Sequence, residues 1–356
     1  MRVLRTLVIL SALVVLGGAC SDDKSDQAAG TATTASTAPS GPQKYTVVVD
    51  GPSTLGAENI AFGAFFPKKL IARPGDTIAF DNRGVSDIHT VTFGVKSDRS
   101  DQPAVVLKNG QINPVVFKPC FTTEPVKPDM TSCPPPVAGT PEFTGKGLWN
   151  SGIFLPTSAP AEAGPKSVTA KLAPDIPPGS YVLTCLLHRF MEGALQVTGS
   201  DTDRLSPAQV AAAADRELGE AKGRVTGIAE PTQAPVANGA TVTAGWGDKL
   251  IGVNRFSPET VSVKIGQTVT WRDVSSWLPH TVSFQPPFKN GEEPDAMLPL
   301  GVKAGGKFAG GVAHSGVFGP KPPFPTDSFS LVFTKPGKYP YLCLLHPGMA
   351  GTVQVG

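Results

Sequence analysis

The chain has 356 residues, of which 39 are Gly, 36 are Pro and 40% are hydrophobic, so it is rich in turns yet apolar enough to fold. It contains only five His and five Cys, which excludes a cluster of several metals that needs many imidazole ligands. The formal net charge is +2, from 31 basic and 29 acidic residues, and this balance gives no electrostatic basis for binding nucleic acid.

Residues 1–19 have the pattern of an export signal. Arg2 and Arg5 precede an apolar run that is too short to cross the ~30 Å of a bilayer core. Small residues then lead directly to Cys20, and this junction resembles a bacterial lipoprotein signal, although Gly17 stands where the usual pattern has Leu. The resemblance implies that Cys20 is lipidated and anchors the protein to the outer face of the cell membrane. The alternative is plain secretion of a soluble protein.

Residues 20–43 consist mainly of Ser, Thr, Ala, Gly and Asp, with few large apolar side chains. Such a composition cannot bury enough surface to fold, so it predicts a flexible tether. The implied layout is a folded protein held off a membrane surface in an oxidising compartment.

The first folded module is predicted over residues 44–199. Short β-branched or aromatic runs at 70–72 and 77–80 are bounded by Pro67 and Gly75, which is typical of strands. His89 follows, and another strand is expected over 90–93. Residues of about 97–148 form a Pro-rich insertion.

Two cysteines lie in this insertion, Cys120 and Cys133. In an exported protein a disulfide is the default for such a pair. Closing a loop of about thirteen residues stabilises the fold by roughly 3 kcal/mol in the chain-entropy model. A thiolate metal site is disfavoured there, since no His lies nearby.

Residues 200–235 are predicted to link two modules through one short helix, over 206–222. Ser206 is a suitable N-cap, Pro207 suits the first helical position, and Gln209 completes a capping box. The following Ala-rich run has high helix propensity. We expect this helix to act as a connector or a packing strut, with no functional site on it.

The second module, residues 236–356, repeats the first. The same residue types recur with steps of 8, 5 and 9: Pro67, Gly75, Phe80 and His89, then Pro258, Gly266, Trp271 and His280. Ser-Gly-x-Phe also recurs, at 151–154 and 315–318, as does Pro-Gly-x-Tyr seven residues before a cysteine, at 178–181 and 336–339. An internal repeat of this kind predicts two copies of one all-β unit.

Each module ends in the motif Cys-x-x-His-x-x-Met and has one further His upstream at the start of a strand. The two sets are Cys185, His188 and Met191 with His89, and Cys343, His346 and Met349 with His280. One thiolate, two imidazoles and a weak thioether form the trigonal site with an axial Met that suits copper in electron transfer. Structural zinc prefers more thiolate ligands and no thioether.

With these motifs the chain resembles the cupredoxins, the blue copper proteins that include plastocyanin, amicyanin and azurin, and its short ligand loop is most similar to that of amicyanin. The resemblance covers both modules. It implies two Greek-key β-sandwiches, each with one type 1 copper ion bound by the four residues named for that module. It also implies that the imidazole edges of His188 and His346 lie near the surface inside an apolar patch, where electrons enter or leave.

The expected function is therefore single-electron transfer between a protein donor and a protein acceptor by a monomeric, membrane-anchored carrier. An alternative is copper binding for storage, delivery or tolerance. A copper oxidase or reductase is less favoured, because the chain has no His-x-His pair and no His next to Cys185 or Cys343. His314 aligns with Asn150 and is expected to be structural or at the surface, while Met130 and Met297 have no ligand partners in sequence.

Overall fold

The computed structural model describes residues 40–52, 59–94, 113–123, 133, 141–201, 203–233, 236–285, 299–321 and 324–356. Residues 38–356 form one compact unit. The predicted signal peptide, Cys20, nearly all of the tether, Met130, Met297 and much of the insertion lie outside the described residues. None of the helices within the described ranges is long and apolar enough to cross a bilayer.

The first module consists of two sheets. In one, the strand order is β3 (Phe65–Phe66), β1 (Lys44–Val49), β5 (Thr77–Asn82) and β9 (Ser167–Lys171). In the other it is β4 (Lys69–Ala72), β11 (Glu192–Val197), β10 (Gly179–Thr184), β6 (Thr92–Phe93), β8 (Leu148–Ser151) and β7 (Pro119–Thr122). Both sheets mix parallel pairs, β1 with β5 and β4 with β11, with antiparallel ones.

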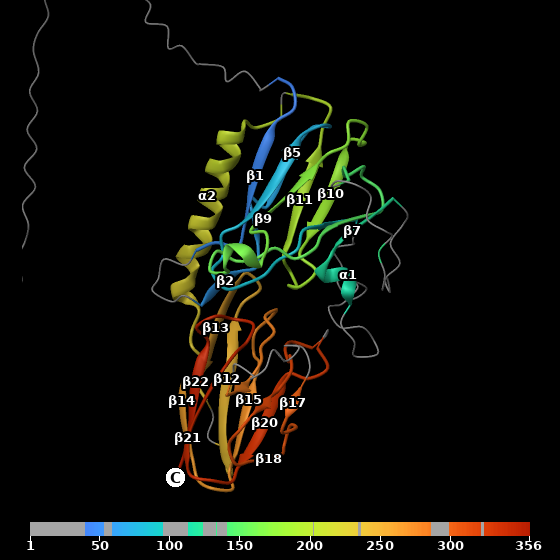
Figure 1. Ribbon diagram of the computed structural model, residues 1–356. Helices are drawn as coiled ribbons and strands as arrows, with labels where there is room; N and C mark the ends of the chain where they lie inside the picture. The colour runs from blue at the N-terminus through green and yellow to red at the C-terminus, as the bar shows by residue number, and fades with distance from the viewer. Residues whose placement is uncertain are drawn as a thin grey trace, which may run out of the picture. The chain divides into compact units, whose positions relative to one another are not determined.

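The second module repeats this plan (Figure 1). One sheet has the order β18 (Lys307–Phe308), β20 (Ser328–Phe333), β15 (Thr268–Arg272), β12 (Gly239–Gly247) and β13 (Ile251–Ser257), followed by β2 (Ile60–Phe62) from the first module. The other has the order β14 (Thr260–Val263), β22 (Ala350–Val355), β21 (Gly337–Leu342), β16 (Ser283–Phe284), β19 (Ala313–His314) and β17 (Leu300–Gly301).

Alternating burial along the strands creates the two cores. In β5, Ile78, Phe80 and Asn82 are buried while the residues between them are half-buried, and β20 shows the same alternation. Buried residues from both sheets of each module join one hydrophobic cluster, which includes Cys185 in the first module and Cys343 in the second. The predicted all-β class, with two sandwiches, is therefore confirmed. Each ligand cysteine belongs to a close-packed core.

The helix α2 (Pro207–Arg224) forms as predicted, two residues longer at its C-terminal end. The Ser206 hydroxyl accepts from the backbone N–H of Gln209, and the Gln209 side chain accepts from the backbone N–H of Ser206, so the capping box is complete. Its buried face includes Ala214, Leu218 and Ala221, which pack with residues of the β1 and β3 region. The helix is thus a packing strut on the first module.

Several short elements were not predicted. These are the four-residue α1 (Pro114–Phe117) and two 3-10 turns, η2 (Ala161–Ala163) and η3 (Val225–Gly227). Asn113 caps α1 by accepting from the N–H of Val115. The strand expected at residue 90 begins two residues later, at Thr92, and its counterpart in the second module begins at Ser283. Of the intervening residues, Thr90 and Thr281 donate to the ligand cysteines, while the carbonyls of Val91 and Val282 accept from the backbone N–H groups of Ser151 and Ser315.

The predicted disulfide is present. Cys120 and Cys133 are bonded, with their Cα atoms 5.4 Å apart. Cys120 is buried beside Val115 and Leu148, so the bond fastens the described part of the insertion to the outer edge of the β-sheet of the first module.

Strand β2 leaves the first sandwich and pairs antiparallel with β13 of the second. The pairs are Ile60 with Val253, Ala61 with Gly252 and Phe62 with Ile251. The residue division between modules at 44–199 and 236–356 remains a prediction. The sheet of the second module nevertheless contains a strand from the first.

One buried ion pair fastens the linker to the first sandwich. The Arg204 side chain is fully buried, its Nη1 lies 3.2 Å from the Asp76 carboxylate, and its Nη2 donates to the Gly41 carbonyl. We expect Arg204→Met to lower the free energy of unfolding by about 3–5 kcal/mol, because it leaves the Asp76 carboxylate buried without its counter-ion. Urea unfolding of the metal-free protein measures this effect.

The control is Arg216→Met in α2, whose side chain is 67% exposed and which should change the free energy of unfolding by less than about 0.5 kcal/mol. Equal stability of the two variants would contradict the role assigned to Arg204.

Candidate metal centres

Each ligand loop joins two antiparallel strands, β10 to β11 in the first module and β21 to β22 in the second. The backbone N–H of Cys185 donates to the carbonyl of Met191 at 3.1 Å, and that of Cys343 donates to Met349 at 2.9 Å. These bonds close each seven-residue loop at its ends. The cysteine, histidine and methionine of the motif are therefore fixed to one end of a rigid hairpin.

The upstream histidines are held by their own backbone. His89 exchanges two hydrogen bonds with Phe154, and His280 exchanges two with Phe318. The phenylalanines belong to the repeated Ser-Gly-x-Phe segments, which explains why these segments recur. Both histidines are 0% exposed.

In the first module, His89, Cys185 and His188 form one buried group whose ligand atoms all lie within 4.8 Å of one another. The Cys185 Sγ lies 3.9 Å from Nδ1 of His89 and 3.7 Å from Nδ1 of His188, and the two Nδ1 atoms are 3.2 Å apart. The three donor atoms thus face one common point.

In the second module, His280, Cys343 and His346 form the equivalent group. Cys343 Sγ lies 3.5 Å from Nδ1 of His346. The two rings, His280 and His346, have their centroids 4.9 Å apart, close to the 4.8 Å between His89 and His188 in the first module. The chain therefore holds two His-Cys-His ligand groups, one in each module.

Each motif methionine is buried beside its cysteine. Met191 is 0% exposed and Met349 is 1% exposed, and each belongs to the same core cluster as the cysteine of its module. A thioether in this position would supply the weak donor that the motif predicts if copper were bound.

The residue after each upstream histidine is a threonine that supports the thiolate, and sequence reasoning missed it. The backbone N–H of Thr90 donates to Cys185 Sγ at 3.4 Å, and that of Thr281 donates to Cys343 Sγ at 3.3 Å. The hydroxyl of each threonine also accepts from the N–H of the residue after the cysteine, at 2.8 Å. The recurrence of His-Thr in both modules was the available signal.

Both thiols are poised to lose their protons. Burial by itself would raise the pKa of Cys185, but the imidazoles of His188 and His89 hold that pKa well below its usual value. The imidazoles of His346 and His280 do the same for Cys343. A buried thiolate between two imidazoles is a metal-ligand environment rather than that of an inert core thiol.

The two sites differ at the Nε2 atom of the upstream histidine. In the first module Asp50 lies 3.4 Å from Nε2 of His89, and bonds to Asp50 and Cys185 outweigh burial and raise the pKa of His89 to about 10. At the corresponding place in the second module stands Gly245, and burial lowers the pKa of His280. The nearest carboxyl, Asp273, is 3.8 Å from His280, and burial keeps its pKa well above the usual range.

These donor sets fit copper. Among the described residues, neither ring nitrogen of His280 has a hydrogen-bond partner, although both are fully buried. A buried imidazole without partners is costly unless a ligand completes it. Two nitrogen donors, one thiolate and a thioether match the blue-copper set and not the donor sets of structural zinc.

The expectation that His188 and His346 present their edges at the surface is wrong. They are only 3% and 2% exposed, because each is covered by the other module. Nε2 of His346 lies 3.0 Å from the Asp87 carboxylate of the first module. The His188 ring meets the Trp277 ring of the second module, with centroids 5.0 Å apart.

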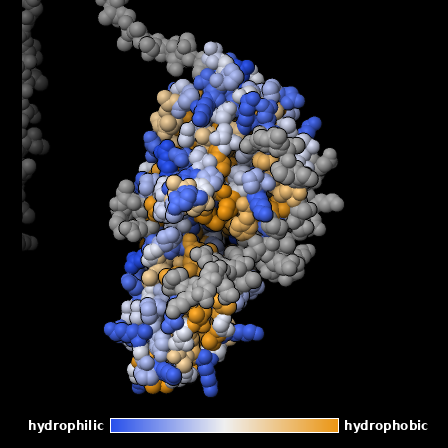
Figure 2. All heavy atoms as spheres, viewed as in Figure 1, coloured by the Kyte–Doolittle hydropathy of each residue, from blue (hydrophilic) through white to orange (hydrophobic). Residues whose placement is uncertain are grey.

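The apolar patches expected around these histidines do exist, but they face each other. Both His188 and His346 line one cavity of about 230 Å³, together with Leu187, Leu345 and Phe324. Figure 2 shows hydrophobic residues near the middle of that face, and others lower down on the second sandwich, among hydrophilic ones.

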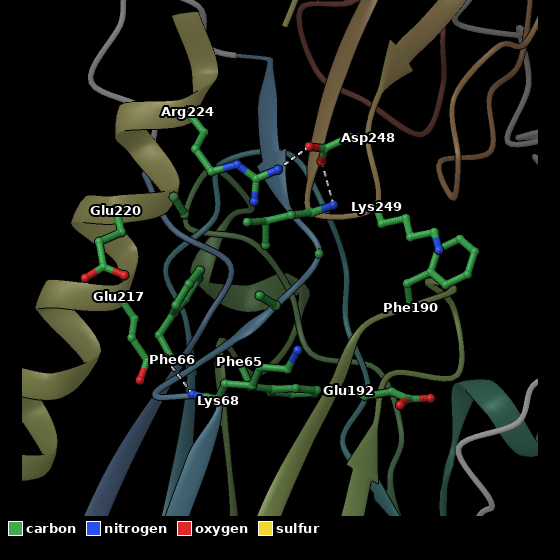
Figure 3. Close-up of a pocket in the computed structure, with 14 residues that line it drawn as sticks. Phe65, Phe66, Lys68, Phe190, Glu192, Glu217, Glu220, Arg224, Asp248 and Lys249 are labelled. Carbon is green, nitrogen blue, oxygen red and sulfur yellow. Dashed lines mark hydrogen bonds and ion pairs between the residues drawn. The ribbon is translucent and has the colours of Figure 1, made fainter. Parts of the chain in front are cut away.

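The ligand loop of the first module also reaches the surface. Phe190, between His188 and Met191, is 40% exposed and lines an open cavity of about 650 Å³ beside α2 (Figure 3). The Lys249 Nζ lies 4.9 Å from the centre of its ring, a cation–π contact. The ligand loop of the second module carries Pro347 and Gly348 at this place, both exposed.

His314, the fifth histidine, is structural. It is 0% exposed, and its Nδ1 lies 2.8 Å from the hydroxyl of Ser283. Its counterpart Asn150 bonds the hydroxyl of Thr92 at 2.9 Å in the same place of the first module. The alignment of these two residues is thus preserved in space.

Gly245 gives a test of the second site. It has a φ of +72°, and a Cβ there would lie only 2.0 Å from Nε2 of the His280 ring. We expect Gly245→Ala to displace His280 and to reduce copper bound per chain from about two ions to about one. Metal analysis after dialysis measures this loss.

The matched control is Gly266→Ala, at a φ of +85°, where no atom of the described part of the chain lies within 4 Å of the added Cβ. It carries the same backbone strain but should keep both ions. Full copper loading of Gly245→Ala would show that His280 is not a ligand.

Comparison with known proteins gives one family. The family model of copper binding proteins of the plastocyanin/azurin family matches residues 248–356. Chloroplastic plastocyanin of Physcomitrium patens is 32% identical over 121 residues, which are 33% of this chain and 59% of that protein. The chain thus spans less than two thirds of the length of this relative.

Similar solved structures include a purple cupredoxin from Nitrosopumilus maritimus, 26% identical, with a TM-score of 0.22, covering 33% of this chain and 99% of that one. A mutant fern plastocyanin is 21% identical, with a TM-score of 0.23, covering 33% and 100%. A mutant of amicyanin in its Cu(I) form is 20% identical, with a TM-score of 0.22, covering 34% and 85%. Residues 248–356 thus match the plastocyanin/azurin family of copper binding proteins, and the first module carries a second group of the same His-Cys-His ligands.

Proposed function

We propose that the protein transfers single electrons through two type 1 copper sites, one in each module. The observation that carries this proposal is the pair of buried His-Cys-His groups, each with a buried Met in the same loop. Copper bound there supplies a one-electron couple between Cu(I) and Cu(II).

The role of the chain is to fix the ligands. The closed loops, the backbone bonds to His89 and His280 and the threonine N–H bonds to sulfur leave each donor with little freedom. A ligand set that suits both oxidation states without moving keeps the cost of reorganisation small. The buried surroundings act in the same direction, since all six His and Cys ligands are shielded from bulk solvent.

The site chemistry favours a carrier over an enzyme. Cupredoxins are generally electron carriers. The residues on either side of the ligand cysteines are Thr184 and Leu186, and Leu342 and Leu344, so no imidazole continues from the cysteine backbone to a second metal. Four of the five histidines of the chain belong to the two ligand groups, and the fifth bonds Ser283.

Storage or delivery of copper is less consistent with the geometry. A protein that hands copper to a partner needs ligands that the partner can reach, whereas all six His and Cys ligands are buried. The described residues therefore favour electron transfer over storage or delivery.

The proposed setting is extracytoplasmic. The leader pattern and Cys20 support anchoring by a lipid at the outer face of the membrane, and the Cys120–Cys133 disulfide fits an oxidising compartment. The partners of a monomeric carrier at this place are a protein electron donor and a protein electron acceptor.

Copper-loaded protein should contain about two copper ions per chain and show an intense thiolate-to-copper charge-transfer band in visible light. Cys343→Ser should remove about half of that absorbance and Cys185→Ser the other half, because each change removes one thiolate. Absorption spectra normalised to protein concentration measure the loss.

The Cys120→Ser, Cys133→Ser double variant is the control, since it removes two sulfurs outside the ligand groups and should keep the full band. A colourless copper-loaded protein, or one that takes up zinc in preference to copper, would refute the proposed function.

A further inference from the structure

The two modules are related by approximate two-fold symmetry where they meet. Between Ala61 and His89, a residue of the first module corresponds to the residue 191 positions later in the second, as Pro67 does to Pro258 and His89 to His280. By this rule Ala61 corresponds to Gly252, and these two residues are paired with each other at the centre of the β2–β13 contact. Equivalent segments therefore run antiparallel across the boundary, and each module presents the same face to the other.

This relation brings each ligand loop against the other module's upstream ligand. His346 of the second site meets Asp87, two residues before His89 of the first site. His188 of the first site meets Trp277, three residues before His280 of the second. The two contacts are placed alike but differ in chemistry, one a hydrogen bond and the other an edge-to-face ring contact at 71°.

Both contact residues are fixed in place. Besides His346, the Asp87 carboxylate accepts from the Ser86 hydroxyl at 3.0 Å and from the Asn254 amide at 3.1 Å. The indole N–H of Trp277 donates to the carbonyl of Asp248 at 3.0 Å. Asp87 and Trp277 are 3% and 1% exposed, so both contacts are shielded from bulk solvent.

Each contact completes a continuous route for an electron between the two ligand groups. From His346 the route crosses one hydrogen bond of 3.0 Å and then follows covalent bonds from Asp87 to His89. From His188 it crosses one ring contact and then follows covalent bonds from Trp277 to His280. Tunnelling of an electron falls off less steeply along bonds than through empty space, so both routes favour transfer.

The space beside the routes is lined mostly by apolar side chains. Leu187, Leu345 and Phe117 line the cavity of about 230 Å³ that both imidazoles share. The face that would receive a partner in a single-module carrier is therefore covered by the other module.

We infer that the two modules are each other's redox partner, and that Asp87 and Trp277 couple the two sites. This inference rests on the proposed function. One electron leaves the reduced site and arrives at the oxidised one, so that one copper is oxidised and the other reduced, with no bond made or broken and no proton moved. Asp87 and Trp277 are positioning residues, since they act through His346 and His188.

The test uses the full chain loaded with copper at both sites. A brief pulse of a radical reductant delivers less than one electron per chain, and the bands of the two sites are followed as the electron redistributes. The Cys185→Ser and Cys343→Ser variants supply the reference spectrum of each single site. Redistribution should keep the same rate when the protein is diluted tenfold.

The variant Asp87→Leu, Trp277→Leu should slow this redistribution at least tenfold while both copper spectra persist. Leu is the residue that the second module carries at the position of Asp87, namely Leu278. When Trp277→Phe replaces Trp277→Leu, a ring is kept against His188. This variant should restore most of the part of the redistribution rate that depends on Trp277. The control Trp149→Leu removes a buried indole of the first module that bonds the Pro141 carbonyl, and should change the rate less than twofold.

A second readout needs no copper. In the metal-free protein, the Nε2–H proton of His346 should exchange slowly with water and give a resolved NMR signal, because it donates to a buried carboxylate. Asp87→Leu should abolish that signal, whereas Trp149→Leu should keep it.

A redistribution rate that falls in proportion to dilution, or an unchanged rate in the double variant, would overturn the inference and leave the proposed function standing. If that variant does not fold, the dilution result on the natural chain decides alone. A protein without two charge-transfer bands would overturn the proposed function itself.

Discussion

Every imidazole in the two ligand groups has been taken out of water, and the structure around them follows from that constraint. One ring nitrogen of each histidine faces the thiolate, so the other must find surroundings inside the protein. Asp50 lies at this position for His89, and Asp87 does so for His346. Because Asp87 belongs to the first module and His346 to the second, the His346 ring finds this partner only when the modules are closed on each other.

The need to keep the modules closed explains why β2 of the first module pairs with the sheet of the second. The pairing of β2 with β13 sets equivalent backbones side by side and places the loops before His89 and His280 against the opposite ligand loops. Burial that would be a liability for a carrier needing outside access becomes an advantage for transfer within the chain. The exposed Phe190 shows that the first ligand loop still reaches the surface on another side.

Much of this could be predicted from sequence. The repeat, the Cys-x-x-His-x-x-Met motif and the upstream histidines are local patterns, and the disulfide and the capped helix follow from short spacings. The contact between Asp87 and His346 spans 259 residues and leaves no periodic signal. Sequence reasoning therefore placed the imidazole edges at a surface, since it treated each module as a separate molecule.

The positions at which the two copies of the repeat differ were the available signal for these contacts. Asp87 stands opposite Leu278, Ser86 opposite Trp277, and Asp50 opposite Gly245, although the ligands themselves are preserved. A position that differs between two copies while its neighbours agree indicates that the copies have different surroundings there. Those positions lie at the module boundary or against a ligand imidazole, where the two sites need different partners.

The central claim is that two copper sites face each other across the module boundary. Anomalous diffraction at the copper edge from crystals of the copper-loaded protein tests it most directly. The account predicts two peaks per chain, one among His89, Cys185 and His188 and one among His280, Cys343 and His346, with His346 on Asp87 and His188 against Trp277. A single peak, a peak outside these groups, or ligand imidazoles open to solvent would contradict it.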